Sequence, residues 1–198
     1  METARDVLLS TAARLFAEEG FDRVSIRQIS EAAGTNSAMI SYYFGSKRGL
    51  YEAVLDHQTA MIRQFLQDAA GEEDPREVIR RYGEAALRIH EENPYLLYYF
   101  YREIVSPEEA HPLFQKLAPL ISGLLAGAVS RGIAQGIFRA DLDVFSAVIQ
   151  LAGMINAYFL SRRMHRYMAG RESAPDEAAY IHQAVEVFLQ GIERRTEP

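Results

Sequence analysis

Residues 25–48 hold the side chains whose types and order best suit a chemical task, and that task is DNA recognition. Proteins contact DNA phosphates with cations and hydroxyl donors, and they read base edges with small polar and apolar side chains. Arg27, Lys47 and Tyr43 belong to the first group. The candidate DNA contacts are Ser25, Arg27, Asn36, Ser37, Ala38, Met39, Ser41, Tyr42, Tyr43 and Lys47.

Two short helices and a tight turn must position these residues. Ser25 and Gln28 have the spacing of a capping box, which starts a helix, and Gly34 suits the left-handed residue that ends one. Asn36 suits the N-cap of the next helix. The pattern predicts a helix-turn-helix, whose second helix enters the major groove of DNA.

Some of these candidates have a purely structural alternative. The sequence favours Asn36 as a cap over a base contact, and Met39 can belong to the core. Core packing and DNA contact both stay open for Tyr42, so Tyr43 is the better contact candidate. Arg27 and Lys47 flank the second helix, which favours phosphate contact over a role as solvated surface.

Charge is distributed unevenly along the chain. The formal net charge is -6, yet residues 1–50 hold six Lys and Arg against six Asp and Glu, so the acidity belongs to residues 51–198. Residues 25–48 carry a net charge of +2. A small DNA-reading surface on an acidic body implies modest non-specific affinity for DNA.

Composition argues against several other classes of protein. The chain has no Cys, which excludes disulfides, thiolate metal sites and cysteine nucleophiles. Its histidines show no i, i+4 pairing, and no phosphate loop, dinucleotide fingerprint or nucleophile elbow occurs, so we expect no metal, no cofactor and no enzyme. No apolar run reaches the length of a membrane span, and the N-terminus lacks the features of a signal peptide. We therefore expect a cytoplasmic protein without a membrane partner.

Helical periodicity runs through the whole chain, and no segment alternates as a strand does, so the predicted fold is all-α. We expect about nine helices, divided between a helix-turn-helix domain at residues 1–50 and a larger helical domain at 51–198. Asp74-Pro75 and Asn93-Pro94 each predict an N-cap followed by a helix. The later long helices are expected over about 47–70, 75–92, 111–135, 141–169 and 175–195.

Five aromatic rings fall within residues 95–101. They can line a ligand pocket that faces the helix expected at 141–169, with His90, Arg102 or Asn156 as a polar anchor, or they can fill a helical core. A pocket of this kind favours a mostly apolar small molecule, although Arg102 could hold one carboxylate. The candidate ligand contacts are His90, Tyr95, Tyr98, Tyr99, Arg102, Met154, Asn156, Tyr158 and Phe159.

The N-terminal quarter of the chain resembles a known family. The residues that match, in fixed order, are Ala12-Ala13, Leu15-Phe16-Ala17-Glu18, Gly20-Phe21, Ser25-Ile26-Arg27-Gln28-Ile29, Ala33-Gly34, Tyr42-Tyr43-Phe44-Gly45-Ser46-Lys47 and Leu50. Residues 7–54 thus resemble the N-terminal domain of TetR-family transcriptional regulators, and the resemblance supports the pocket interpretation of the rings. Position 41 is commonly Tyr in that family and is Ser here, so a frequent DNA-contacting ring is absent.

The last two helices carry apolar stripes wider than one neighbour would cover, which favours dimerisation. In the resembled family this helix pair meets its symmetry mate in a four-helix bundle. Gly153 and Ala157 would permit close approach of helices, although the stripes could instead pack only inside the subunit. The candidate dimer contacts are Leu151, Ile155, Ile181, Val185, Phe188 and Ile192.

These patterns, together with what the family resemblance implies, predict a ligand-responsive transcriptional regulator in which residues 51–198 form the ligand-binding and dimerisation domain. It would repress by binding a pseudo-palindromic DNA operator as a homodimer, and a small, mostly apolar effector would release it. An acidic helical carrier or sensor without DNA binding is the alternative, supported by Ser41 and the weak positive charge. An all-α enzyme is a third class, for which the sequence offers no catalytic constellation.

Overall fold

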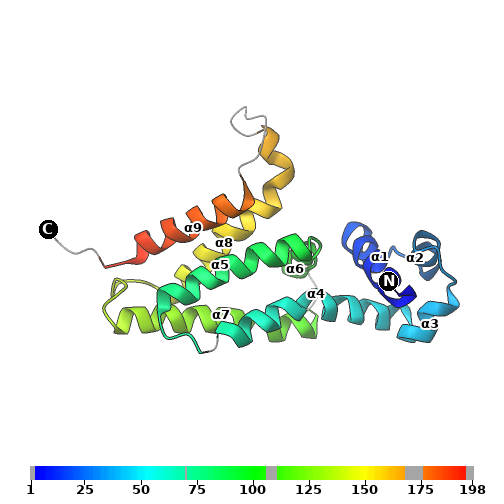
Figure 1. The fold of residues 1–198 in the computed structure, drawn as a ribbon, viewed down its shortest axis with the longest axis horizontal. Helices are drawn as coiled ribbons and strands as arrows, with labels where there is room; N and C mark the ends of the chain where they lie inside the picture. Colours follow the sequence, from blue (N-terminus) through cyan, green and yellow to red (C-terminus); the bar gives the residue numbers. More distant parts are fainter. Residues whose placement is uncertain (1–2, 70, 106–110, 168–175, 195–198) are drawn as a thin grey trace.

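The computed structural model describes residues 3–69, 71–105, 111–167 and 176–194. Within these ranges the chain forms nine α-helices and one short 3-10 helix, and its only strand-like feature is an isolated antiparallel bridge between Phe138 and Glu193. The all-α prediction and the expected number of helices are confirmed. A small N-terminal domain is joined to a larger helical body by one long helix (Figure 1).

The N-terminal domain is built on α1 (Ala4–Glu19), α2 (Ile26–Ala32) and α3 (Ala38–Phe44). Capping boxes start the first two helices, because the Thr3 and Ser25 hydroxyls accept hydrogen bonds from the backbone N–H groups of Asp6 and Gln28. These side-chain bonds satisfy N–H groups that have no partner within the helix. The capping box expected at Ser25 is confirmed.

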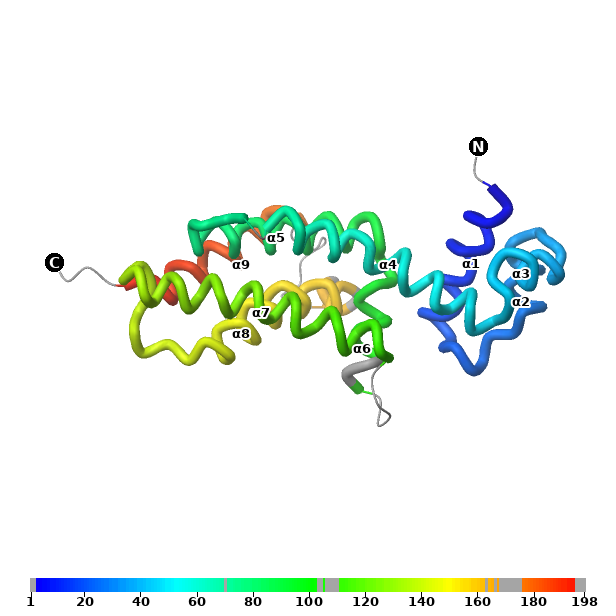
Figure 2. Tube along the Cα trace, turned by 90° about the horizontal axis from the view of Figure 1, so that it is seen from below, coloured from blue at the N-terminus to red at the C-terminus, as the bar shows by residue number. Residues whose placement is uncertain are grey.

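The core of this domain extends past residue 50. Its buried side chains come from the first three helices and from later parts of the chain, among them Leu8, Phe16, Ile29, Ile40, Leu50, Val54, Leu55, Tyr99 and Phe114. Helix α4 (Lys47–Ala69) runs without a break from this core into the larger body (Figure 2). The domain boundary expected at residue 50 therefore falls inside a continuous helix.

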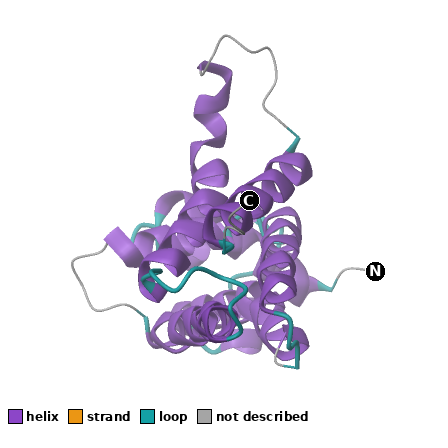
Figure 3. Cartoon of the chain, turned by 90° about the vertical axis from the view of Figure 1, so that its left-hand side faces the viewer, coloured by secondary structure: helices purple, strands orange, loops and turns teal. Residues whose placement is uncertain are grey.

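The larger body contains α5 (Pro75–Glu92), α6 (Leu96–Val105), α7 (Pro112–Ala134), α8 (Val144–Ser161) and α9 (Glu177–Ile192). Helix α5 packs against α4, α7 and α9, and α8 packs against α7 and α9. The 3-10 helix η1 (Arg162–Tyr167) continues α8 and projects from the body (Figure 3). The single helix expected over 141–169 thus changes type at Arg162, and its last two residues lie outside the described ranges.

Two helices, α7 and α8, are long and apolar enough to cross a membrane by length and composition alone. The expectation that no apolar run reaches this length is therefore corrected. Leu125 and Val129 of α7 share one buried core cluster with Leu151 and Ile155 of α8. Core helices of soluble proteins pass the same test, so the two helices are weak evidence for a membrane role.

Candidate DNA-reading surface and effector cavity

The turn between α2 and α3 depends on a glycine and an asparagine. Gly34 has a φ of +62°, a left-handed conformation that side chains rarely adopt. The Asn36 Oδ1 atom accepts a hydrogen bond of 2.9 Å from the backbone N–H of Ala38. The N-cap position itself falls on Ser37, one residue later than predicted, and the Ser37 side chain makes no capping bond.

Helix α3 presents a small polar face to solvent. Ser37, Ala38 and Ser41 are exposed, and Tyr42 is 79% exposed. Met39 is half-buried and packs against the core. The outward face has the residue sizes that let a helix backbone come close to base edges.

The two tyrosines of α3 differ in exposure, and the one preferred from the sequence as a DNA contact, Tyr43, is the less exposed. Tyr43 packs against the core beside Ile40 and Phe44, which lie on the same side of the helix. Tyr42 points away, because a step of one residue turns the helix by about 100°. Tyr42 is therefore the more exposed of the two, while Tyr43 is half-buried, and DNA contact by either ring stays a prediction.

Cations flank α3 on both sides. Arg27 is exposed on α2, where its Nε atom lies 2.7 Å from a Glu31 carboxylate oxygen. Lys47 starts α4, and its Nζ atom lies 4.4 Å from the centroid of the Phe21 ring. Arg48 is exposed beside it and lies over the same ring at 5.8 Å. Arg48 was missing from the sequence-based set, although its place next to Lys47 could have signalled it.

The body contains an apolar cavity of about 300 Å³. Its lining comes from α4, α5, α6, α7 and α8 and is mostly aliphatic and aromatic, with Ile62, Leu96, Phe100, Leu125 and Val148 among the contributors. This volume lies at the lower end of the range for small-molecule sites, about 300–1,000 Å³. The arrangement can hold a compact, mostly apolar ligand.

Two of the predicted ligand contacts, His90 and Asn156, line this cavity. Burial lowers the pKa of His90 to about 4, and the interaction of its ring with the Asn156 amide acts in the opposite direction. The ring of Phe159, a third candidate, lies 3.7 Å from the His90 ring between centroids. Tyr82 also lines the cavity, and burial raises the pKa of its hydroxyl to about 12.

The ring cluster of α6 divides between two sides of the helix, so the expectation that all of it faces α8 is corrected. Leu97, Phe100 and Tyr101 line the cavity. Tyr99 is buried against α1, where its hydroxyl donates a 2.7 Å hydrogen bond to the Ala13 carbonyl oxygen. Tyr95, Tyr98 and Arg102 border a separate, more polar pocket together with Ala17 and Glu18.

Arg102 and two further ligand candidates, Met154 and Tyr158, lie away from the cavity lining. The Arg102 guanidinium donates to the Ala17 carbonyl oxygen at 3.4 Å, so it offers no anchor inside the cavity. The Met154 backbone carbonyl accepts a hydrogen bond from the Tyr180 hydroxyl at 2.9 Å. The ring of Tyr158 stacks on the ring of Tyr180 with centroids 4.4 Å apart, which places both in the contact between α8 and α9.

The six predicted dimer contacts are buried inside a single subunit, each with 5% exposure or less. They are Leu151, Ile155, Ile181, Val185, Phe188 and Ile192, and they belong to one core cluster. An apolar stripe on a helix can be buried against its own subunit or against a partner, and the sequence pattern is the same in both cases. Here the subunit itself covers the stripe. Other residues of the same helices are left exposed: Phe145 at 69%, Ile149 at 53% and Val187 at 52%.

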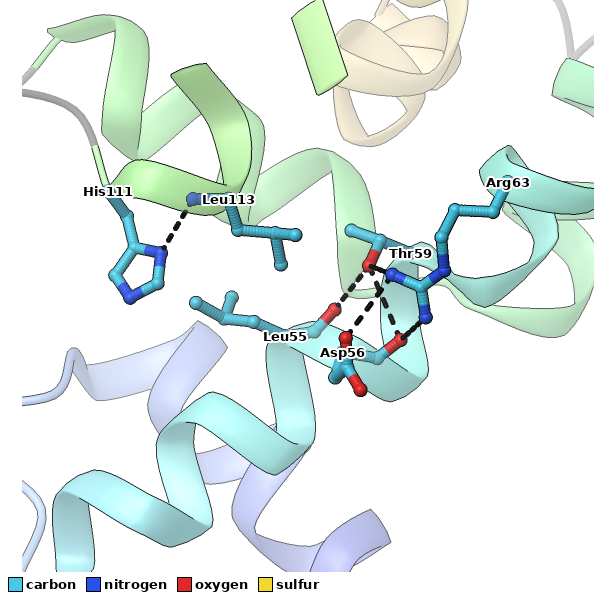
Figure 4. A network of polar contacts seen from close by, with 6 residues as sticks. All are labelled: Leu55, Asp56, Thr59, Arg63, His111 and Leu113. Carbon is cyan, nitrogen blue, oxygen red and sulfur yellow. Dashed lines mark hydrogen bonds and ion pairs between the residues drawn. The ribbon is translucent and has the colours of Figure 1, made fainter. Parts of the chain in front are cut away.

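A polar network lies in the middle of α4, between the two domains (Figure 4). The buried Thr59 hydroxyl donates to the Leu55 carbonyl oxygen at 2.8 Å, and Arg63 donates to the Asp56 carboxylate and carbonyl oxygens at 3.2 and 3.0 Å. Hydroxyl bonds of this i−4 type often bend helices. A change in the bend of α4 at this network would therefore move the N-terminal domain relative to the body.

Comparison with known proteins agrees with this architecture. A family model described as "Bacterial regulatory proteins, tetR family" matches residues 8–54. The repressor NicS of Pseudomonas putida is 28% identical over 98% of this chain and 94% of its own. The repressor KstR2 of Rhodococcus jostii is 30% identical over 71% of this chain and 70% of its own.

Solved structures show the same fold. The ketosteroid transcriptional regulator KstR2 of Mycobacterium tuberculosis superposes with a TM-score of 0.80, covering 98% of this chain and 97% of that one, at 21% identity. The names of these three relatives describe regulation of transcription and not catalysis. The 30% identity to KstR2 of Rhodococcus jostii over most of both chains, together with the match of the family model at the helix-turn-helix, shows that the chain belongs to the TetR family of transcriptional regulators.

Proposed function

We propose that this protein is a homodimeric repressor that binds a pseudo-palindromic DNA operator and is released by a small, mostly apolar effector. The observation that carries the proposal is the exposed face of α3, with Ser37, Ala38, Ser41 and Tyr42 directed to solvent. Arg27 and Lys47 flank that face and supply phosphate contacts. A repressor of this kind acts on DNA in the bacterial cytoplasm, and the names of NicS and KstR2 support repression over activation.

The proposed dimer uses the exposed side of α8 and α9. Phe145, Ile149 and Val187 are large apolar side chains left uncovered by their own subunit, and the space beside Gly153 of α8, where a Cβ would lie, is open. A second copy of the chain would bury this surface. Two-fold symmetry would then place two α3 helices in major grooves about 34–36 Å apart, or at a multiple of that spacing.

The proposed switch runs through α6, which contacts both functional regions. One side of α6 lines the cavity through Leu97 and Phe100, and the other side holds α1 through the Tyr99 hydrogen bond to Ala13. An effector that displaces α6 would therefore displace α1. The effector favours the conformer whose reading helices no longer match the operator, which shifts the population away from DNA.

A gel-shift titration with DNA from upstream of the gene and its neighbours tests the proposal. We expect retardation by a dimer at one site, with competition by the same unlabelled fragment and weak competition by random DNA. Footprinting of the retarded fragment should then show two related half-sites. Absence of retardation on every upstream fragment at micromolar protein would contradict the proposed function and favour a carrier or sensor without DNA binding.

A further inference from the structure

The lining of the cavity in the body carries a few polar side chains and no charged one among the described residues. None of the described residues that line it is Asp, Glu, Lys or Arg. A charged group that enters such a space loses its hydration and finds no opposite charge in return, which is costly unless the group is neutralised. The lining therefore selects against ionised ligands.

His90 of α5 and Asn156 of α8 both belong to this lining. A neutral imidazole has one N–H donor and one acceptor nitrogen, and the carboxamide has two N–H donors and an acceptor oxygen. A bond between the two side chains would use one donor and one acceptor, so the pair has hydrogen-bonding groups left for a ligand.

Burial keeps this pair uncharged. Desolvation holds the pKa of His90 at about 4, so the imidazole is neutral at neutral pH. The ring is also held by Phe159, whose centroid lies 3.7 Å away. An uncharged, positioned donor and acceptor is suited to an oxygen atom that is itself uncharged.

From this arrangement we propose that the effector is an uncharged, largely hydrocarbon molecule with one carbonyl or hydroxyl oxygen, and that His90 and Asn156 bind this oxygen. The regulatory role of this ligand rests on the proposed function, whereas its binding to the cavity is independent of DNA. A carboxylate on the same carbon skeleton is rejected, because Arg102, the cation that could have held it, is directed to Ala17 on α1.

Matched probes test the proposal by calorimetry on the full-length, DNA-free protein. One series is 2-acetylnaphthalene, 2-naphthoate and 2-ethylnaphthalene, and the other is 2-decanone, decanoate and decane. Within each series the skeleton is shared, and only the polar group changes. In at least one series we expect the ketone to bind about tenfold more tightly than both the carboxylate and the hydrocarbon.

Two substitutions locate the binding groups. Asn156→Leu keeps the branched shape and the number of side-chain heavy atoms and removes the amide, so it should reduce the ketone affinity to that of the hydrocarbon. Ser122→Ala removes a hydroxyl from another position in the same lining and should leave the ketone preference intact. The hydrocarbon makes no hydrogen bond to the amide, so Asn156→Leu should still bind it. Binding of the hydrocarbon by the variant would show that the variant is folded.

Three outcomes would overturn the proposal: carboxylates that bind as tightly as ketones, a ketone preference that survives Asn156→Leu, or no binding of either ketone up to its solubility limit. Gel shifts of the ligand-free protein separate this failure from that of the proposed function. A protein that binds DNA but prefers carboxylates refutes only the ligand class. One that prefers ketones but retards no DNA refutes only the regulator.

Discussion

The N-terminal domain presents its candidate functional groups to solvent, whereas the helical body directs its own into an internal cavity. In the domain, the side chains of Ser41 and Tyr42 project outward from a short helix. In the body, His90 and Asn156 are directed inward to a cavity whose walls come from five helices. An outward surface is set by the sequence of one helix, whereas an inward one is set by how several helices pack.

The two regions also differ in charge. Cations lie around α3, with Arg27, Lys47 and Arg48 all in reach of solvent. The cavity lining has none of the charged residue types among the described residues. A polyanion such as DNA and an uncharged small molecule are therefore recognised by separate parts of one chain, joined by α4 and α6.

The largest effect should come from charges placed on the two sides of α8. Leu151 is 1% exposed in the core, and Leu151→Asp should lower the free energy of unfolding by more than about 4 kcal/mol because the new carboxylate is buried without a partner. Ile149 is 53% exposed, and Ile149→Asp should stay folded and become monomeric. Urea denaturation and sedimentation velocity measure the two effects.

These two variants also decide which side of α8 meets a partner. If Leu151→Asp were a folded monomer, this result would support the dimer interface expected from the sequence, which includes Leu151. A dimeric Ile149→Asp would show that the exposed side of α8 is not the interface.

The next effect is the pH dependence contributed by His90. The pKa of His90 is about 4 in the folded protein and about 6.5 in an unfolded chain. Between these values the unfolded state binds more protons, so stability rises with pH and is lost as the pH falls from 6.5 toward 4. The loss attributable to His90 is at most roughly 3 kcal/mol.

His90→Gln isolates that contribution. Unfolding free energies of the wild type and the variant, measured from pH 4 to 7, should differ in slope within this window. Parallel curves for the two proteins would show that His90 is not held neutral by burial.

A smaller effect is expected at the contact between α6 and α1. Tyr99→Phe removes the hydroxyl that donates to Ala13 and leaves a buried carbonyl without this donor, at a cost of about 1–3 kcal/mol. Tyr98 is 49% exposed on the same helix, and Tyr98→Phe should change stability little. Equal stabilities for the two variants, measured by urea denaturation, would mean that the buried bond does not hold the domains together.

The smallest effect is a change in the salt dependence of DNA binding. Lys47→Ala should weaken binding to all sequences alike and reduce the slope of log affinity against log salt by about one. Lys116→Ala, on the exposed side of α7, is the matched control and should leave the slope unchanged. Ser41→Ala should instead alter sequence preference, and a Lys47→Ala slope equal to wild type would remove Lys47 from the phosphate contacts.

Local signals predicted the N-terminal domain well. The Ser25–Gln28 capping box and the left-handed Gly34 depend on residues within one turn of each other, so they can be recognised without the rest of the fold. The roles of Tyr42 and Tyr43 could not be assigned in this way. A helix of seven residues is too short for its apolar period to show which ring faces the core.

Packing between distant segments limited prediction of the body. Helix α6 has apolar residues all round, and its sequence alone does not say that Tyr99 meets α1 while Phe100 meets the cavity. The stripes of α8 and α9 were found correctly as apolar, but whether such a stripe is covered by its own subunit or by a partner depends on α5 and α7. Helix boundaries, by contrast, follow local caps, and α5 begins and ends at the residues expected.

Operator affinity measured with and without a saturating cavity ligand tests most directly whether the two regions are coupled. Fluorescence anisotropy on a fragment found by gel shift, with the ketone that binds most tightly, gives both values for the wild type. Operator affinity should fall when the ketone is bound, and ketone affinity should fall by the same factor when operator is bound. An operator affinity that is unchanged at saturating ketone would contradict the account, because the cavity would then be a binding site without influence on DNA.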